Sequence, residues 1–196
     1  MGYVTSISQQ KKRLRTKVLR ARDAMSQEER EAKSAMIFTR LRDLHVYKEA
    51  DSVALFVTYR SEMNTYLILD EILERGKSVA VPRVTGRGEM EFFRITDHKK
   101  DLEVGAFGIR EPRPGSELTR PQDIDLLLTP GAVFDPFGYR IGYGGGFYDR
   151  YIKRLRPDCP VIALGFELQI VDRVPTEQFD TPVDMIVTED RVIRAG

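Results

Sequence analysis

The segment Gly138–Arg150, which reads GYRIGYGGGFYDR, has four glycines within five positions and charged residues on both sides of them. Because glycine lacks a Cβ atom, the backbone N–H groups of such a stretch can come within hydrogen-bonding distance of an anion. Arg140 adds a planar fork of donors that suits phosphate, and Asp149 adds an oxygen ligand of the kind that holds Mg²⁺ beside a nucleotide. A sharp turn between two elements would explain the glycines alone. The two charged residues therefore favour a phosphate site.

A second charged group lies near the start of the chain, where the stretch from Lys11 to Arg22 holds seven basic residues and no acid. Lys11 and Arg15 are four residues apart, so in a helix both side chains project from one face and could close over a polyphosphate. A solvated helix face is the plain alternative. Contact with nucleic acid is a weaker one, because the net charge of the whole chain is only +1.

Carboxylates at two further places are candidates for ligand contacts. Glu62 directly follows an expected strand, where its side chain could accept hydrogen bonds from an N–H-rich heterocycle, although an acid before a helix is also common. In residues 174–189, which we call the tail, Asp184 could reach the same metal as Asp149, because Mg²⁺ takes one or two carboxylates together with phosphate oxygens and water. Asp180 is expected to cap a turn instead.

Length and composition indicate one soluble domain. The chain has 196 residues, with 31 basic and 30 acidic side chains, so net charge identifies no partner. Cys159 is the single cysteine, which excludes an internal disulfide and predicts a buried structural thiol in a reducing compartment. His45 and His98 stand far apart and support no histidine-centred site. No apolar run is long enough to span a bilayer and no signal peptide begins the chain, so we expect a cytoplasmic protein.

Strands and helices are expected to alternate around these residues. The pattern predicts helices over residues 8–24, 26–43, 64–75 and 147–155, the second beginning with a capping box of Ser26 and Glu29. It predicts strands over residues 52–57, 78–81, 124–128, 133–134, 161–165, 185–188 and 192–194, and an extended piece within 85–95. Residues 105–122 are expected to form a long surface loop that could include a short strand. Val133 and Phe134 are expected to extend the main sheet. Such alternation implies a doubly wound α/β sheet, in which ligands lie beyond the carboxyl ends of the strands.

Five motifs in this order resemble the 5-formyltetrahydrofolate cyclo-ligases, also called methenyltetrahydrofolate synthetases. They are KKRLR near the start, SEMNT, LLLTPGAVFD, RIGYGGGFYDR and the tail VPTEQFDTPVD, and together they span nearly the whole chain. The resemblance implies a single domain over residues 1–196 with a three-layer, doubly wound and mostly parallel sheet, related to the ribose-5-phosphate isomerase-like scaffold. It implies ATP- and Mg²⁺-dependent conversion of 5-formyltetrahydrofolate to 5,10-methenyltetrahydrofolate with release of ADP and phosphate. The expected partners are these two small molecules, without nucleic acid or membrane, and the expected state is a monomer.

The resemblance also assigns roles to residues. It places ATP against Lys11, Arg15, Gly142, Tyr143, Gly144, Gly145, Gly146, Phe147, Tyr148 and Asp149. It places the folate against Val57, Glu62, Gly144, Gly145, Gly146, Phe147 and Tyr148. It assigns catalysis to Arg140, Glu62 and Tyr148, and the Mg²⁺ to Asp149 and Asp184.

The implied chemistry needs positioning more than a protein nucleophile. The formyl oxygen would attack the γ-phosphate of ATP, and N10 would then close the ring as phosphate leaves, which calls for arginines, a metal and backbone N–H groups. An exposed Arg140 would then matter more for turnover than for stability. Three positions depart from the family pattern, where Phe147 replaces a tyrosine, Phe179 a histidine and Met63 a smaller aliphatic residue.

Two other functions fit parts of the pattern. A sugar-phosphate isomerase on the same scaffold would use the phosphate loop and a carboxylate but no ATP metal. A nucleotide-sensing or RNA-contacting module would use the basic first helix.

Overall fold

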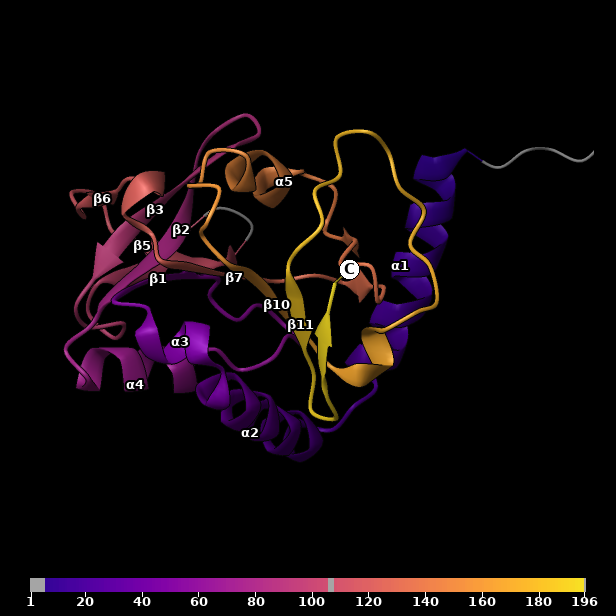
Figure 1. Cartoon of the computed structure of the whole chain (residues 1–196), viewed down its shortest axis with the longest axis horizontal. Coiled ribbons are helices and arrows are strands. Elements are labelled where there is room, and N and C mark those ends of the chain that lie inside the picture. Colours follow the sequence, from indigo (N-terminus) through magenta and orange to yellow (C-terminus); the bar gives the residue numbers. More distant parts are fainter. Residues whose placement is uncertain (1–5, 106–107, 196) are drawn as a thin grey trace, which may run out of the picture.

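The computed structural model describes residues 6–105 and 108–195 and is centred on an eight-stranded sheet (Figure 1). The strand order is β12-β11-β10-β7-β1-β2-β3-β6. Strands β11, β10, β7, β1 and β2 pair in parallel, whereas β12, β3 and β6 pair with their neighbours in antiparallel fashion. The bounds are β1 Ser52–Leu55, β2 Ser78–Gly86, β3 Glu89–Ile95, β6 Leu118–Thr119, β7 Leu126–Thr129, β10 Val161–Leu164, β11 Met185–Val187 and β12 Val192–Arg194. The predicted α/β class is confirmed.

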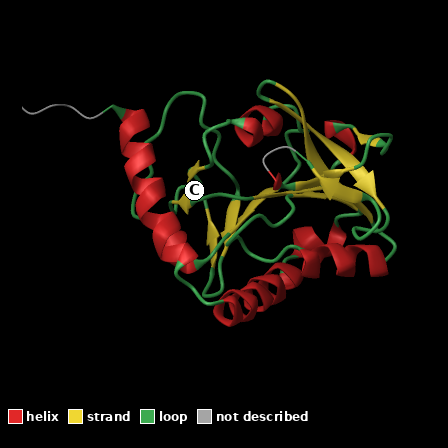
Figure 2. Cartoon of the chain, turned by 180° about the vertical axis from the view of Figure 1, so that it is seen from behind, coloured by secondary structure: helices red, strands yellow, loops and turns green. Residues whose placement is uncertain are grey.

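Helices cover both faces of this sheet (Figures 1 and 2). One face carries α2 (Gln27–Asp43), α3 (His45–Glu49) and α4 (Tyr66–Glu74), and the other carries the short α5 (Phe147–Ile152). Side chains alternate between the faces along β1, so Val53 and Leu55 pack on the α2 and α4 side while Ala54 faces α5. Ala54 shares its face with Ala163, and these small residues leave room for Tyr151 of α5. The three layers therefore follow from strand alternation.

The first helix, α1 (Ile7–Asp23), stands at one end of the sheet rather than over a face (Figure 1). It begins at Ser6, whose hydroxyl accepts from the Gln9 N–H while the Gln9 side chain bonds back to Ser6. Its apolar side packs on the hairpin of β8 (Val133–Phe134) and β9 (Arg140–Ile141), with Val18 against Ile141 in one buried cluster. This packing brings α1 beside the glycine segment that follows β9.

The remaining elements are short. They are the hairpin of β4 (Leu102–Val104) and β5 (Arg110–Pro112) and two turns of 3-10 helix, η2 (Pro121–Asp123) and η3 (Glu167–Gln169). Among the described residues, no helix has both the length and the apolar character that crossing a bilayer would need. Cys159 is buried, as predicted.

Several predicted boundaries were wrong for identifiable reasons. β2 does not end at Pro82 but continues to Gly86. β1 pairs with β2 only as far as Ala80, so Pro82 interrupts no hydrogen bonds between these two strands. β8 does not extend the sheet, since it forms a separate hairpin with β9. Asn64 is not the N-cap of α4, which is Thr65, although the Asn64 side chain does accept from the Tyr66 N–H.

Candidate active site

Two cavities lie on either side of residues 142–146, which we call the glycine loop. The first, the apolar cavity, has a volume of about 550 Å³ and opens beyond the carboxyl ends of β1 and β7. Val57 and Glu62 line it from the chain that follows β1, and Pro130 lines it from the chain that follows β7. Phe147 and Tyr148 of α5 close another side. A flat, partly apolar ligand with polar groups at one edge suits such a cavity.

The second, the basic cavity, has a volume of about 530 Å³ and lies between α1, the glycine loop and the tail. Lys11 and Arg15 reach it from α1, and Arg150 reaches it from α5. Glu177 and Asp180 line it from the tail. The lysines and arginines make it suited to a polyanion.

The glycine loop is the common wall of the two cavities. Gly142, Gly145 and Gly146 line both, together with Arg140 and Asp149. Ligands in the two cavities would therefore lie next to each other, bordered by the same backbone atoms and the same two charged side chains. Gly145 and Gly146, which the resemblance assigns to both ligands, belong to this shared wall.

The loop conformation explains why its residues are glycines. Gly144 has a φ of +103° and Gly146 a φ of +65°, which are backbone conformations that side chains with a Cβ seldom adopt. Gly145 has an ordinary φ, but a Cβ there would stand 2.4 Å from the Phe147 ring. A larger residue at Gly145 would therefore displace that ring, which lines the apolar cavity.

Arg140 was expected to be exposed, and this prediction was wrong. The residue is 6% exposed, because β9 is packed beneath the tail, where Nη1 of Arg140 donates to the Thr181 carbonyl at 2.8 Å. Nη2 lies 3.3 Å from Oδ1 of Asp149 and has no hydrogen-bond partner among the described atoms. Burial lowers the pKa of Arg140, while the charge of Asp149 opposes that shift. A buried guanidinium with a free donor at the wall of two cavities is a ready anion contact.

Glu62 is almost fully enclosed at the edge of the apolar cavity. Its Oε1 accepts from the Tyr143 hydroxyl at 2.8 Å, and its Oε2 accepts from the Tyr59 N–H at 3.0 Å. Burial raises the pKa of Glu62 above 4.5, although the Tyr143 hydrogen bond and the charge of Arg22 oppose the rise. A carboxylate with a raised pKa and two oriented oxygens can accept a proton from a ligand.

Tyr148 lines the apolar cavity together with Glu62 and Arg140. Burial and the Glu62 carboxylate raise the pKa of its phenol, and the Arg140 charge opposes that rise. Its ring packs edge-on against Phe92 at a centroid separation of 6.4 Å. The hydroxyl therefore stays protonated near neutral pH and can donate a hydrogen bond into the cavity.

Lys11 and Arg15 occupy the face of α1 that sequence spacing predicted. Lys11 is paired with Glu177 at 3.1 Å and with Asp180, so Asp180 does more than cap a turn. Burial lowers the pKa of Lys11, but the hydrogen bonds that Lys11 donates to these two carboxylates, together with their charges, outweigh burial and the pKa is raised. Arg15 donates from Nη1 to the Gly142 carbonyl at 3.3 Å, which links α1 to the glycine loop.

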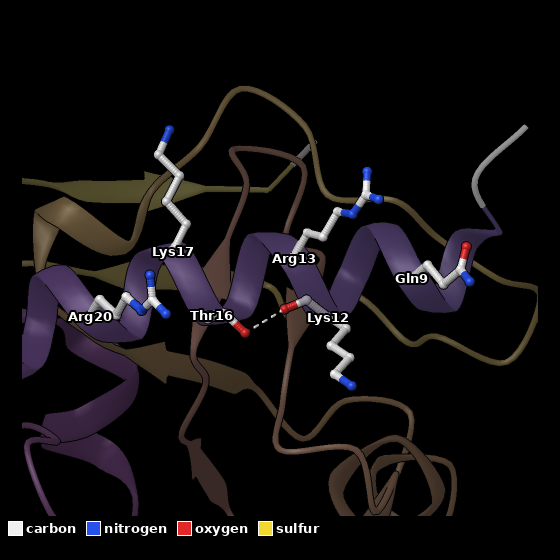
Figure 3. A pocket seen from close by; sticks show the side chains of 6 residues that line it. All are labelled: Gln9, Lys12, Arg13, Thr16, Lys17 and Arg20. Atoms are coloured by element: carbon white, nitrogen blue, oxygen red, sulfur yellow. Dashed lines mark hydrogen bonds between the residues drawn. The ribbon is translucent and has the colours of Figure 1, made fainter. Parts of the chain in front are cut away.

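The other basic residues of α1 divide into two further groups. Around an open hollow along the helix lie the exposed side chains of Lys12, Arg13, Lys17 and Arg20, of which Lys12 also lines the basic cavity (Figure 3). Arg13, Lys17 and Arg20 correspond to the solvated face that was the plain alternative. Arg22 turns inward and is 2% exposed, with a hydrogen bond from Nη2 to the Tyr143 hydroxyl at 2.9 Å. Sequence analysis did not single out Arg22 as a site residue.

The two aspartates that were predicted to share a metal lie in different surroundings. Asp149 lines both cavities, and its Oδ1 accepts from the Thr181 N–H at 3.1 Å. Asp184 lines neither cavity, and its Oδ2 accepts from the N–H of Val161 at the amino end of β10. Their pairing on one Mg²⁺ therefore gains no support from this geometry. No group of three His, Cys, Asp or Glu side chains suited to a metal occurs among residues 6–105 and 108–195.

Comparisons with known proteins agree with one another. The model of the 5-formyltetrahydrofolate cyclo-ligase family matches residues 7–189. A 5-formyltetrahydrofolate cyclo-ligase of Mus musculus is 29% identical over 200 residues, covering 97% of this chain and 98% of that protein, and the one of Escherichia coli K12 is 26% identical, covering 87% and 96%. The solved structure of a 5,10-methenyltetrahydrofolate synthetase of Aquifex aeolicus has a TM-score of 0.84 at 36% identity, covering 94% of this chain and 92% of that one. Both cavities fall within the matched range.

Proposed function

The chain belongs to the 5-formyltetrahydrofolate cyclo-ligase family, and on this premise we propose that it closes 5-formyltetrahydrofolate into 5,10-methenyltetrahydrofolate at the expense of ATP. The observation that carries the proposal is the glycine loop as a common wall, with a basic cavity on one side and an apolar cavity on the other. A reaction that transfers a phosphoryl group from one ligand to another needs two such adjoining sites.

ATP would bind with its phosphates in the basic cavity. Lys11 and Arg15 would contact the phosphates, and Lys11 would exchange its carboxylate partners Glu177 and Asp180 for phosphate oxygens. The end of the triphosphate nearest the glycine loop would accept hydrogen bonds from the N–H groups of that loop. It would also accept one from Nη2 of Arg140, which has no described hydrogen-bond partner.

Mg²⁺ fits this arrangement with a single protein carboxylate. Asp149 borders both cavities, and Mg²⁺ often takes one carboxylate and completes its shell with phosphate oxygens and water. A Mg²⁺ ion bound there would neutralise charge that develops on the phosphate oxygens.

The folate would occupy the apolar cavity with its reacting edge towards the glycine loop. Val57 and Phe147 would pack on its rings, while Tyr148 would donate a hydrogen bond near the formyl group. Glu62 would orient N10, because its carboxylate borders the same cavity and has a raised pKa.

The reaction would proceed in two steps. The formyl oxygen attacks the γ-phosphorus, the bond to the ADP oxygen breaks, and a phosphorylated imidate remains at N5. N10 then adds to the activated carbon and gives its proton to Glu62, and the carbon–oxygen bond breaks to release inorganic phosphate. Arg140 would hold the negative charge in both steps, since it lies at the wall between the ligands.

The deciding assay follows the absorbance of methenyltetrahydrofolate after the protein is mixed with 5-formyltetrahydrofolate, Mg²⁺ and ATP. We expect product that depends on ATP and appears in equal amount with ADP. Folded protein that forms no product with ATP present would overturn the proposal. Glu62→Gln tests the assigned base, and full turnover with unchanged folate affinity in that variant would remove Glu62 from the mechanism.

A further inference from the structure

A buried arginine outside both cavities connects three segments of the site. Arg22 lies in the last turn of α1 and is 2% exposed. Its Nε donates to the Ser61 hydroxyl at 3.0 Å and its Nη2 donates to the Tyr143 hydroxyl at 2.9 Å. Its Nη1 points to the Gly131 carbonyl at 3.5 Å. One side chain therefore contacts the chain after β1, the chain after β7 and the glycine loop.

The positive charge of Arg22 is linked to carboxylates through intervening hydroxyl groups and not by a direct ion pair. Within the described part of the chain, no carboxylate lies at ion-pair distance from its guanidinium. The Tyr143 hydroxyl passes the interaction on to Oε1 of Glu62 at 2.8 Å, and the Ser61 hydroxyl donates to Asp23. Leaving a guanidinium buried without a direct partner is costly, so the two hydroxyl contacts are what make this position tolerable.

The arginine also fixes the direction of these hydrogen bonds. A guanidinium has five donors and no acceptor, so a hydroxyl that meets it must accept there and point its own hydrogen elsewhere. For Tyr143 the remaining partner is Glu62, which receives the hydroxyl hydrogen. Arg22 thus sets the position of Tyr143. It also determines that Oε1 of Glu62 is the oxygen that accepts the Tyr143 hydrogen bond.

We propose that Arg22 is a positioning residue for the ring-closing reaction, holding the glycine loop through Tyr143 and presenting Glu62 to N10 in one orientation. The inference rests on the proposed function, because the role given to Glu62 comes from it. It goes beyond that function by assigning a task to Arg22, which lines neither cavity, and to the hydroxyl of Tyr143.

A pH profile separates this role from a merely structural one. The groups that face Glu62 are Arg22 from α1, Tyr143 from the glycine loop, Tyr148 from α5 and the N–H of Tyr59. The charge of Arg22 and the hydrogen bond of Tyr143 both lower the pKa of Glu62. Removing either one should therefore move the acid limb of kcat/KM to higher pH, whereas a loss of packing alone would lower the rate without moving the limb.

The experiment compares Arg22→Gln, Tyr143→Phe, the double variant and the control Arg20→Gln in the full chain. Arg20 is exposed on the outer face of the same helix. We expect Arg22→Gln and Tyr143→Phe each to lower kcat/KM by about 10- to 100-fold, the range for losing a hydrogen bond to a charged group. The double variant should lose little more than the worse single one, because both changes break one chain of contacts.

Hydrogen exchange without substrates tests the positioning by itself. Peptides that cover residues 142–146 should exchange faster in Arg22→Gln and Tyr143→Phe and at the wild-type rate in Arg20→Gln. If wild-type protein makes no product, the proposed function fails, and the exchange data still test how the loop is held. A folded Arg22→Gln variant with kcat/KM within threefold of wild type and an unmoved acid limb overturns the inference. If Arg22→Gln does not fold, the same result for Tyr143→Phe overturns it.

Discussion

Replacing Arg140 by methionine should damage both stability and turnover. Methionine keeps much of the apolar volume but removes the guanidinium that bonds the Thr181 carbonyl and pairs with Asp149 at 3.3 Å. Breaking a fully buried pair costs about 3–5 kcal/mol, but the Asp149 side chain is 26% exposed and keeps the Thr181 N–H. Water therefore screens part of the loss, and we expect a cost of about 2–3 kcal/mol, or a fall in Tm of about 5–10 °C.

The kinetic effect should exceed what this instability explains. Losing one preorganised donor at a site of developing charge costs about 100- to 1,000-fold in rate, which we expect for kcat/KM of Arg140→Met at a temperature where the variant is fully folded. Arg156→Met is the control for losing an arginine–aspartate pair away from the cavities, because Arg156 pairs with Asp125 at 3.2 Å and lines neither cavity. Folded Arg140→Met with kcat/KM within threefold of wild type, or a loss that merely follows the unfolded fraction, would refute the reasoning.

Four further predictions rest on Glu62, Gly146 and Cys159. Because burial raises the pKa of Glu62 above 4.5, kcat/KM should fall as the pH drops through that raised value, and Glu62→Gln should lack this acid limb. The same shift makes the contribution of Glu62 to stability largest below pH 4.5 and lost as the pH rises through the folded pKa, which urea unfolding at several pH values can measure. Gly146→Ala should cost about 1–2 kcal/mol in thermal unfolding because its φ is +65°, whereas Gly142→Ala, whose Cβ meets no described atom within 4 Å, should cost far less. Cys159, whose pKa burial raises to about 11, should react with a thiol reagent at pH 8 only as fast as the protein unfolds, and fast labelling without denaturant would contradict its buried position.

Local patterns predicted the parts of the site that depend on nearby residues. The glycine loop, its place beyond the carboxyl ends of the strands and the shared face of Lys11 and Arg15 follow from glycine content, strand order and helical spacing. The buried thiol of Cys159 follows from composition in the same way. The glycine content of the loop and the helical spacing of Lys11 and Arg15 are set within a few residues along the chain.

What sequence analysis missed depends on contacts between distant segments. Arg20 and Arg22 are alike in a basic run, and the buried one differs in its contacts with distant segments, such as the Tyr143 hydroxyl 121 positions away. Arg140 is buried for a similar reason, since its partner is the carbonyl of Thr181 in the tail. Asp184 looked equivalent to Asp149 by residue type, but strand pairing carries it to the amino end of β10.

The common wall of the two cavities has a thermodynamic consequence. Gly142, Gly145 and Gly146 border both ligand sites, so a ligand that shifts or stiffens this backbone changes the free energy with which the other ligand binds. By linkage the effect would be reciprocal: whatever factor a nucleotide applied to the affinity for a folate, the folate would apply to the affinity for the nucleotide. Under the proposed function, the glycine loop would thus make the two substrates each other's effectors, without any second conformation of the sheet that carries them.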